Sequence, residues 1–246
     1  MRLKDKVAIV TGGASGFGEG IVRRFAREGA KVVIADLNDD AAQKLAREID
    51  GMAVQADVSK AADVKALAEA AVARFGDIDI LVNNAGIGHK PQPLDTISEE
   101  VFDRILAVNA KSVFLTAQEI VPRMKARKTG AILNIASTGG VSPRPNLTWY
   151  NSSKGWMITA TRAMAVELAP FGVRVNAINP VAGETPLLAT FMGEDTPAIR
   201  AKFLASIPIG RFSTPADIAA TALFLCSDEA SMITGVAMEV DGGRCI

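Results

Sequence analysis

Short apolar runs alternate with amphipathic segments along most of this chain. Seven runs of strand length cover residues 7–11, 31–36, 52–56, 78–82, 131–136, 173–178 and 236–240. Between them, apolar residues recur at intervals of three and four, which predicts helices that follow Gly18 and that cover 39–48, 61–75, 102–125, 155–169 and 215–224. Strands and helices that alternate with short connections indicate an α/β fold with one doubly wound parallel sheet and helices on both faces.

The composition fits one large domain over residues 1–246. Of its 246 residues, 49% are apolar and 22% are charged, which is enough apolar side chain for a full core. The formal net charge is zero, and no basic stripe or long apolar run points to nucleic acid or to a membrane. Cys226 and Cys245 lack the spacing of metal ligands or of a disulfide framework, so we expect no metal and a reducing cytoplasm.

A glycine-rich turn joins the first predicted strand to the first predicted helix. It reads Thr11-Gly-Gly-Ala-Ser-Gly-Phe-Gly18 and includes Gly12, Ser15, Gly16 and Phe17. Glycines allow the backbone to approach a pyrophosphate closely, and the amino terminus of the following helix favours its negative charge. The turn therefore predicts a Rossmann-type dinucleotide site.

Asp36 ends the second predicted strand, 18 residues after Gly18. A dinucleotide-binding unit places an acid at about this distance, where it binds the ribose hydroxyls of the adenosine. Its carboxylate would repel a 2′-phosphate, and neither Leu37 nor Ser15 offers a cation to such a phosphate. These three residues favour NAD over NADP. The alternative for Asp36 is a helix N-cap or a turn acid.

A hydroxyl, a phenol and an ammonium group are expected at one carboxyl edge of the sheet. Ser137 follows a predicted strand, and Tyr150 and Lys154 lie one helical turn apart on one face. Lowering a phenol pKa from about 10 to about 7 requires about 4 kcal/mol. One cation at about 4 Å supplies that order of energy at an effective dielectric of about 20. Tyr150 is therefore a candidate acid/base with Lys154 as its cation, although an ordinary helix pair is the alternative.

Three other features stand near the same edge. Asn109 lies inside the predicted helix 102–125, where a buried amide needs a partner. His89 is the only histidine, and its loop predicts a solvated residue rather than an acid or base. Residues 181–212 follow a strand end and read as an irregular segment, which is either a substrate lid or a plain surface excursion.

The assembled motifs resemble those of the short-chain dehydrogenase/reductase family over essentially the whole chain. The glycine turn resembles the cofactor loop of that family, Asp57-Val58 its adenine contact, and Asn83-Asn84-Ala85-Gly86 its central structural motif. The catalytic tetrad of the family is matched by Asn109, Ser137, Tyr150 and Lys154.

The resemblance implies a role for each of these positions. Tyr150 would be the acid/base and Ser137 would orient the substrate, while Lys154 would hold the nicotinamide ribose and lower the Tyr150 pKa. Asn109 would anchor a water that relays protons through Lys154. Other cofactor contacts would come from residues around the central motif and after the sixth strand, namely Asn84, Ala85, Gly86, Ile87, Pro180, Val181, Gly183 and Thr185. Members are mostly homotetramers built through helices near 103–125 and 150–169 and the last strand.

The sequence departs from the family at one position. The family usually has Pro-Gly after the sixth strand, whereas here Pro180 is followed by Val181 and the glycine comes at Gly183. The backbone at the nicotinamide edge and the role of Thr185 are therefore open to a different arrangement.

The expected function is NAD(H)-dependent hydride transfer between nicotinamide and a secondary alcohol or ketone. The pocket is expected to be apolar with few charges, which favours an uncharged substrate and is assigned to Ser137, Gly139, Val141, Asn146, Trp149, Leu187, Leu188 and Phe191. A reductase of 3-oxoacyl thioesters and a sugar or polyol dehydrogenase are the alternatives within the same class. A non-catalytic NAD-binding sensor is the alternative from a different class.

Overall fold

The strands form a single sheet in the computed structural model, which describes residues 1–246. Its order is β3-β2-β1-β4-β5-β6-β7, and every neighbouring pair is parallel. The doubly wound parallel sheet of about seven strands that the sequence predicts is therefore confirmed. The strands are β1 Val7–Thr11, β2 Lys31–Asp36, β3 Met52–Gln55, β4 Ile80–Asn83, β5 Gly130–Ile135, β6 Val173–Pro180 and β7 Ala237–Val240.

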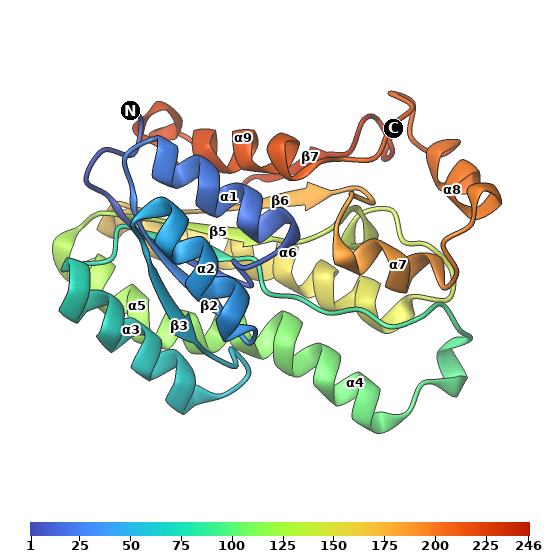
Figure 1. Cartoon of the computed structure of the whole chain (residues 1–246), viewed down its shortest axis with the longest axis horizontal. Helices are drawn as coiled ribbons and strands as arrows, with labels where there is room; N and C mark the ends of the chain where they lie inside the picture. Colours follow the sequence, from blue (N-terminus) through green and yellow to red (C-terminus); the bar gives the residue numbers. More distant parts are fainter.

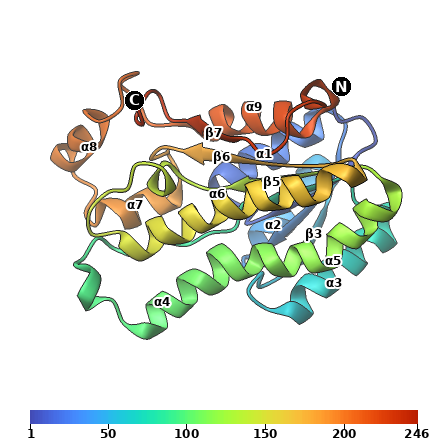
Figure 2. The same cartoon turned by 180° about the vertical axis from the view of Figure 1, so that it is seen from behind.

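Helices cover both faces of this sheet (Figures 1 and 2). One face carries α1 Gly16–Arg27, α2 Asp39–Ile49 and α9 Pro215–Cys226, and the other carries α3 Ala61–Phe75, α5 Ser112–Arg127 and α6 Thr148–Leu168. The alternation of side chains along β1 shows why two cores form. Ala8 and Val10 belong to the core under α1, α2 and α9, while Ile9 belongs to the core under α3, α5 and α6.

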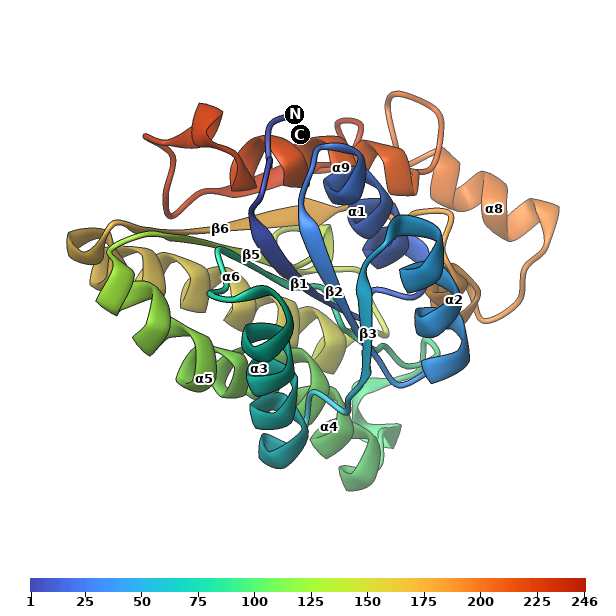
Figure 3. The same cartoon turned by 60° about the vertical axis from the view of Figure 1, so that its left-hand side comes forward.

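The order of the strands creates a crevice between β1 and β4. The chain leaves β1 toward β2 and β3, which lie side by side in Figure 3. It then returns across the sheet to β4 before it continues to β7. The loops after β1 and β4 diverge at this switch point, where open α/β sheets bind their ligands. Thr11 ties the two strand ends together, because its Oγ1 accepts hydrogen bonds from the backbone N–H groups of Asn84 and Ala85, each at 3.1 Å.

The segment predicted as one helix over 102–125 is divided in the structure. It begins earlier, with α4 Glu99–Leu106, passes through a π-helical turn at Ala107–Lys111 and continues as α5. Ser98 caps the start, since its side chain accepts from the Val101 N–H. The π turn contains Asn109, whose side-chain amide forms hydrogen bonds with the N–H and the carbonyl oxygen of Ile87. Helical backbone thus extends from Glu99 to Arg127 and includes the predicted long helix, but the period of apolar residues does not reveal the π turn within it.

Residues 181–212 are not irregular as expected, because they contain α7 Pro186–Met192 and α8 Pro197–Leu204. Both prolines stand at the first helical turn, where a missing N–H does no harm, so they begin helices instead of breaking them. The segment has a small core of its own, made by Val181, Leu188, Met192, Ile207 and Phe212. In Figure 1 these two helices lie beyond the carboxyl end of β6. None of the helices in the structure combines the length and the apolar character that a membrane crossing requires.

Candidate active site

A cavity of about 660 Å³ opens at the carboxyl edge of the sheet. Its lining comes from the carboxyl ends of β1 to β6 and from α4, α6, α7 and α8. It includes most of the positions expected to bind a cofactor, namely Gly12, Ser15, Gly16, Phe17, Asp36, Leu37, Asp57, Val58, Asn84, Ala85, Gly86, Tyr150, Lys154, Pro180, Val181, Gly183 and Thr185.

Gly18 is the expected cofactor residue that does not line the cavity. A Cβ at this position would lie 2.0 Å from the Gly12 carbonyl oxygen and 2.6 Å from the Asn84 Nδ2. The absence of a side chain at Gly18 therefore lets α1 pack against its own loop and against β4. Its contribution to the site is structural, and the expected direct contact with the cofactor is not supported by the geometry.

The amino terminus of α1 fits a pyrophosphate group. Ser15 occupies the N-cap position, yet its side chain forms no capping hydrogen bond, so the first N–H groups of the helix lack that partner. Gly12 and Gly16 both have positive φ, at 59° and 55°, which bends the loop in front of the helix. Gly16 also lies directly against Thr185, since a Cβ at Gly16 would lie 3.2 Å from the Thr185 side chain. The N–H groups at the start of α1 and the bent glycine loop in front of them can hold the phosphates of a dinucleotide.

Asp36 is held at the end of β2 by two backbone groups. Its Oδ2 accepts from the Ala14 N–H at 3.0 Å, and its Oδ1 accepts from the Asn38 N–H at 3.0 Å. The N-cap of α2 is Asn38, so Asp36 is a turn acid but no helix cap. Its carboxylate still lines the cavity beside Leu37, whose side chain is 61% exposed. A negative charge and an apolar surface thus stand together where an adenosine would lie.

Asp57 and Val58 continue the same end of the cavity. The Asp57 Oδ1 accepts from both the N–H and the hydroxyl of Ser59, which lowers the pKa of the Asp57 carboxyl. Val58 is buried and packs with Val64 and Leu115, so its position is fixed by the α3 and α5 layer. This pair can provide a polar edge and an apolar wall to a flat ring system.

The side chains of Tyr150 and Lys154 are buried on the same face of α6. The Lys154 Nζ donates to the Ile135 carbonyl oxygen at 2.8 Å, which holds the ammonium against the end of β5. Burial lowers the pKa of Lys154 to about 8. Burial also raises the pKa of Tyr150 to about 12, and the neighbouring Ser137 hydroxyl offsets only part of this rise.

The pKa of Tyr150 is therefore opposite to the expected direction. The spacing of Tyr150 and Lys154 predicts that the Lys154 charge has the largest effect on the phenol pKa, whereas desolvation of the phenol is the larger effect in the structure. A phenol in this state keeps its proton at neutral pH and can act as an acid. Acting as a base requires further positive charge beside it.

Asn109 is fully buried and has the partners that the sequence argument required. Its Oδ1 accepts from the Ile87 N–H, and its Nδ2 donates to the Ile87 carbonyl oxygen and to the Ser153 Oγ, all at 2.9 Å. It does not line the cavity. A Cβ at Gly86 would lie 3.2 Å from the Lys154 Nζ and 3.4 Å from the Asn109 Oδ1. The missing side chain of Gly86 thus leaves space between these two polar groups.

Val181 is accommodated without a glycine. Its side chain is buried in the small core of residues 181–212, beside Leu188 and Phe212, and it also lines the cavity. The glycine requirement lies two residues later, because a Cβ at Gly183 would lie 2.3 Å from the Phe17 ring and 2.6 Å from the Ser213 Oγ. Val181 in place of the usual glycine therefore fits into this part of the cavity wall without displacing it.

The substrate end of the cavity only partly matches the expected residues. Ser137, Gly139, Leu187, Leu188 and Phe191 line it. By contrast, Val141, Asn146 and Trp149 do not.

Physical reasons for these three absences are visible in the structure. Val141 and Asn146 are exposed on the loop between β5 and α6. Trp149 points the other way around α6, where its Nε1 donates to the Leu94 carbonyl oxygen at 3.2 Å and its ring meets Phe102 edge-on at 5.3 Å. Nearness in sequence to Tyr150 was thus a poor guide to which side chains face the cavity.

The lining residues that were not expected include Arg144, Leu147, Asn151 and Phe203. The guanidinium of Arg144 lies 4.5 Å above the Phe203 ring, which comes from α8. No periodic pattern in the sequence singles out Arg144, since it lies between two prolines in a loop. Its presence corrects the expectation of an apolar pocket with few charges.

His89 is buried and not solvated as expected. Its Nδ1 lies 2.8 Å from the Lys90 carbonyl oxygen, and its Nε2 is buried without a partner. The loop after β4 folds against the molecule here, as the neighbouring Gly88 shows, where a Cβ would lie 2.4 Å from the Phe191 ring. His89 does not line the cavity. That it is no acid or base of this site stays a prediction.

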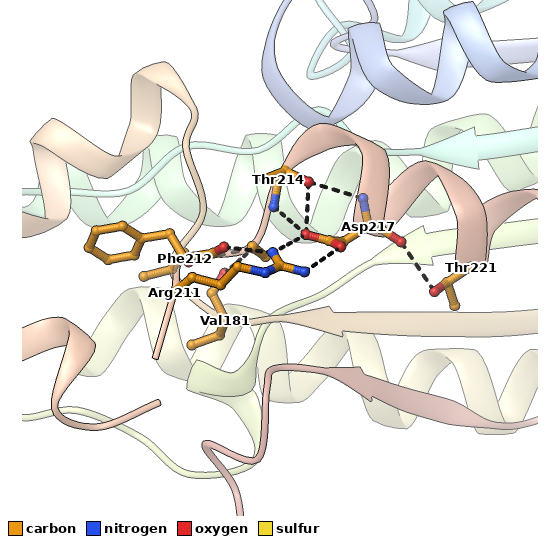
Figure 4. A network of polar contacts seen from close by, with 8 residues as sticks. Val181, Arg211, Phe212, Thr214, Asp217 and Thr221 are labelled. Carbon is orange, nitrogen blue, oxygen red and sulfur yellow. Dashed lines mark hydrogen bonds and ion pairs between the residues drawn. The ribbon is translucent and has the colours of Figure 1, made fainter. Parts of the chain in front are cut away.

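The segment 181–212 returns to the main fold through a bidentate ion pair (Figure 4). Arg211 donates to the two carboxylate oxygens of Asp217 at 2.6 and 2.9 Å, and to the Phe212 carbonyl oxygen at 3.0 Å. Asp217 also accepts from the N–H and hydroxyl of Thr214, which cap α9. Arg211, followed by Thr214, holds the pKa of this carboxyl far below its ordinary value. One end of the segment is thus anchored to α9.

Comparisons with known proteins agree with this site. A family model described as enoyl-(acyl carrier protein) reductase matches residues 12–244. The chain is 50% identical to 4-formylbenzenesulfonate dehydrogenase of Comamonas testosteroni and 39% identical to 3-oxoacyl-(acyl-carrier-protein) reductase of Thermotoga maritima. Each alignment has 252 positions and covers 100% of both proteins.

A solved structure is similarly close. The crystal structure of a 3-ketoacyl-(acyl-carrier-protein) reductase from Brucella melitensis, complexed with NADH, is 54% identical and has a TM-score of 0.95. The match covers 99% of this chain and 100% of that one. Full-length likeness at these identities, together with the tetrad and the glycine turn at the switch point of the sheet, shows that the chain belongs to the short-chain dehydrogenase/reductase family.

Proposed function

We propose that this protein is an NAD(H)-dependent oxidoreductase that transfers a hydride between nicotinamide and the carbon of a secondary alcohol or ketone. The observation that carries this proposal is the position of Ser137, Tyr150 and Lys154 on the wall of the cavity that also contains the glycine turn and Asp36. The relatives in the family are dehydrogenases and reductases, and the Brucella structure was solved with NADH.

The cofactor residues divide into four groups along the cavity. The turn before α1 would hold the pyrophosphate, Asp36 the adenosine ribose, and Asp57 with Val58 the adenine. Asn84, Ala85, Gly86, Pro180, Val181, Gly183 and Thr185 would surround the nicotinamide half. When bound, the cofactor supplies or accepts the hydride. Asp36 favours NAD(H), because its charge opposes a 2′-phosphate.

The chain's own residues handle the substrate oxygen and its proton. In the reduction direction, the protonated Tyr150 donates its proton to the carbonyl oxygen, and Ser137 holds that oxygen by a hydrogen bond. In the oxidation direction, the phenolate must accept the proton of the alcohol, and Lys154 supplies positive charge beside it. Asn109 keeps the loop after β4 against α6 and would anchor a water near Lys154.

The first experiment measures NADH oxidation across cyclic ketones, aryl ketones, keto-sugars and a 3-oxoacyl thioester, with NADPH in parallel. Aromatic aldehydes join the panel, because the name of the Comamonas relative includes a formyl group on a benzene ring. Turnover with NADH on one class would support the proposal and define the substrate chemistry. Absence of turnover on every class, with NADH bound, would favour the sensor alternative.

Tyr150→Phe is the variant that tests the catalytic assignment. We expect it to fold and to bind NADH, because the ring keeps its packing against Phe191. We expect its turnover to fall by several orders of magnitude, because the proton donor is gone. A variant as active as the wild type would end the assignment of Tyr150 as the acid/base.

A reductase of 3-oxoacyl thioesters is the second candidate. Two relatives with that name, from Thermotoga and Brucella, favour it. Asp36 opposes it mildly, since reductive biosynthesis usually draws on NADPH. Acetoacetyl-CoA serves as the 3-oxoacyl thioester of the panel above, and its kcat/KM relative to those of the simple ketones decides between the two candidate functions. A sugar or polyol dehydrogenase would be favoured instead if a keto-sugar were the substrate with the highest kcat/KM.

We also propose one catalytic domain over residues 1–246 with a substrate lid at 181–212, a homotetramer and a cytoplasmic location. The separate small core of α7 and α8 supports the lid. Exposed Phe114, Trp156 and Val166 on α5 and α6 support an interface on those helices. The cytoplasm fits two free cysteines. Light scattering of the purified protein tests the oligomer, since a monomer at micromolar concentration would exclude it.

A further inference from the structure

Arg144 places a positive charge in the wall of the substrate end of the cavity. Its guanidinium lies over the Phe203 ring at 4.5 Å, and one of its terminal nitrogens, Nη2, donates to the Ser206 Oγ at 2.8 Å. Asn151 holds the backbone of the loop between β5 and α6, because its Nδ2 donates to the Arg144 carbonyl oxygen at 2.8 Å. Since Asn151 follows Tyr150 on α6, the cation is tied to the same helix as the proposed acid/base.

No carboxylate balances this charge. Arg144 forms no ion pair with any acid of the chain, and Ser206 is its one hydrogen-bond acceptor. A guanidinium has five N–H donors, so most of those of Arg144 lack a protein acceptor. Arg174 shows the contrast, because its half-buried guanidinium donates to three backbone carbonyl groups that account for its presence.

A second cation increases the positive charge of the same region. Arg244 donates to the Oγ and the carbonyl oxygen of Ser142, at 3.0 and 3.4 Å, and Ser142 itself lines the cavity. Arg244 also forms no ion pair, and its Nε is buried without a partner. Burial, and after it the charge of Arg244, lowers the pKa of Arg144, so two like charges are held near each other without an intervening acid. Two unpaired like charges are unfavourable unless a bound anion neutralises them.

We propose that the substrate carries an oxyanion, a carboxylate or sulfonate, which Arg144 binds while the carbonyl or alcohol group faces Tyr150. A planar guanidinium matches the two oxygens of such a group. Leu147, Leu187 and Phe191 also line the cavity and would enclose the apolar body of the substrate. This inference rests on the proposed oxidoreductase function and adds the substrate class to it.

The experiment compares 4-acetylbenzoate with its methyl ester and with acetophenone, in NADH oxidation by the full-length protein. These ketones share a ring and differ in whether they carry a carboxylate. We expect the wild type to prefer 4-acetylbenzoate to the ester by about 10- to 100-fold in kcat/KM, the range of one hydrogen bond to a charged group. Equal kcat/KM values for the acid and its ester would overturn the proposal.

Arg144→Met keeps an apolar stem over Phe203 and removes the charge. We expect it to lose the preference for the carboxylate, so that the ratio of kcat/KM for 4-acetylbenzoate to kcat/KM for its ester falls to about 1. Arg144→Lys, which retains a cation, should keep part of the preference. Arg47→Met is the matched control, because Arg47 is exposed on α2 and lies outside the cavity. A preference that survives in Arg144→Met would also overturn the proposal.

Calorimetric binding of 4-acetylbenzoate and its ester, with NADH present, separates this inference from the proposed function. If none of the ketones is turned over, the proposed function fails on this panel. The anion site still stands when the wild type binds the acid at least 10-fold more tightly than Arg144→Met does, and it falls when the two bind it equally. Far-UV circular dichroism of each variant checks that the fold is unchanged.

Discussion

The ring of Phe191 lies 4.7 Å from the ring of Tyr150, centroid to centroid, at an angle of 52°. Phe191 comes from α7 in the segment 181–212, whereas Tyr150 comes from α6 in the main fold. The same phenylalanine ring covers the backbone of Gly88 after β4. One side chain therefore closes the proposed lid over the phenol, and it accounts for part of the burial that raises the Tyr150 pKa.

Phe191→Ala is expected to open the cavity above Tyr150. Loss of an aromatic pair of about 0.5–1.5 kcal/mol corresponds to a rise of about 2- to 10-fold in the KM of the ketone. Better hydration of the phenol should also lower the pKa of Tyr150, since burial is what raises it. The pH profile of kcat/KM measures this shift. Phe191→Leu retains the apolar cover as a control, and an unchanged profile in Phe191→Ala would contradict the role of Phe191.

Asp36→Asn should narrow or reverse the preference for NADH over NADPH. The amide retains an oxygen that can accept from the Ala14 N–H, so the loop is kept while the charge is removed. We expect the ratio of the two kcat/KM values to shift by about 10-fold or more, the order of one charge interaction near a protein surface. Asp40→Asn, at an exposed position of α2 outside the cavity, is the control for net charge. A constant ratio in Asp36→Asn would mean that the carboxylate does not face the ribose.

Lys154→Met tests whether the buried ammonium destabilises the fold. The pKa of Lys154 is lowered from 10.5 to about 8, so between these values the unfolded chain binds a proton that the folded chain has released. Stability from this group therefore rises with pH and is fully present only above pH 10.5. Relative to Lys154→Met, the wild-type free energy of unfolding should rise by about 2 to 3 kcal/mol between pH 7 and pH 10.

Urea unfolding of both proteins at several pH values measures this difference. The pKa of Tyr150, raised to about 12, has the opposite sign, because the stability it gives is lost as pH rises from about 10 to about 12. That loss begins at about pH 10, at the upper end of the range compared, so it contributes little to the comparison. A difference that stays flat from pH 7 to pH 10 would show that Lys154 is not held in a desolvated state.

Gly183→Ala should weaken the contact between the lid and the cofactor loop. Its Cβ would overlap the Phe17 ring and the Ser213 hydroxyl, and forced repacking of this kind costs about 1–3 kcal/mol. Urea unfolding measures the loss, and NADH titration should show weaker binding. Gly155→Ala is the matched control, because its Cβ would meet only an ordinary contact at 3.7 Å inside α6. Alanine there should stabilise the helix by about 0.5–1 kcal/mol, so equal effects at both sites would contradict this explanation.

The sequence determined the elements whose pattern is local. The alternating strands and helices, the glycine turn before α1, and the strand-end positions of Asp36 and Ser137 all follow from neighbours within a few residues. The spacing of Tyr150 and Lys154 likewise placed both on one face of a helix. The motif residues share a cavity because the carboxyl ends of parallel strands meet at one edge.

The tertiary structure decided what depends on distant parts of the chain. The π turn at Asn109 exists because its amide binds Ile87, 22 residues earlier. The rise in the Tyr150 pKa depends on burial, to which Phe191 of α7 contributes. Contacts with Phe203 and Ser206, about 60 residues later in the chain, hold the Arg144 side chain at the site. Period and propensity describe how a segment folds by itself, whereas desolvation and unpaired charge depend on which segments pack together.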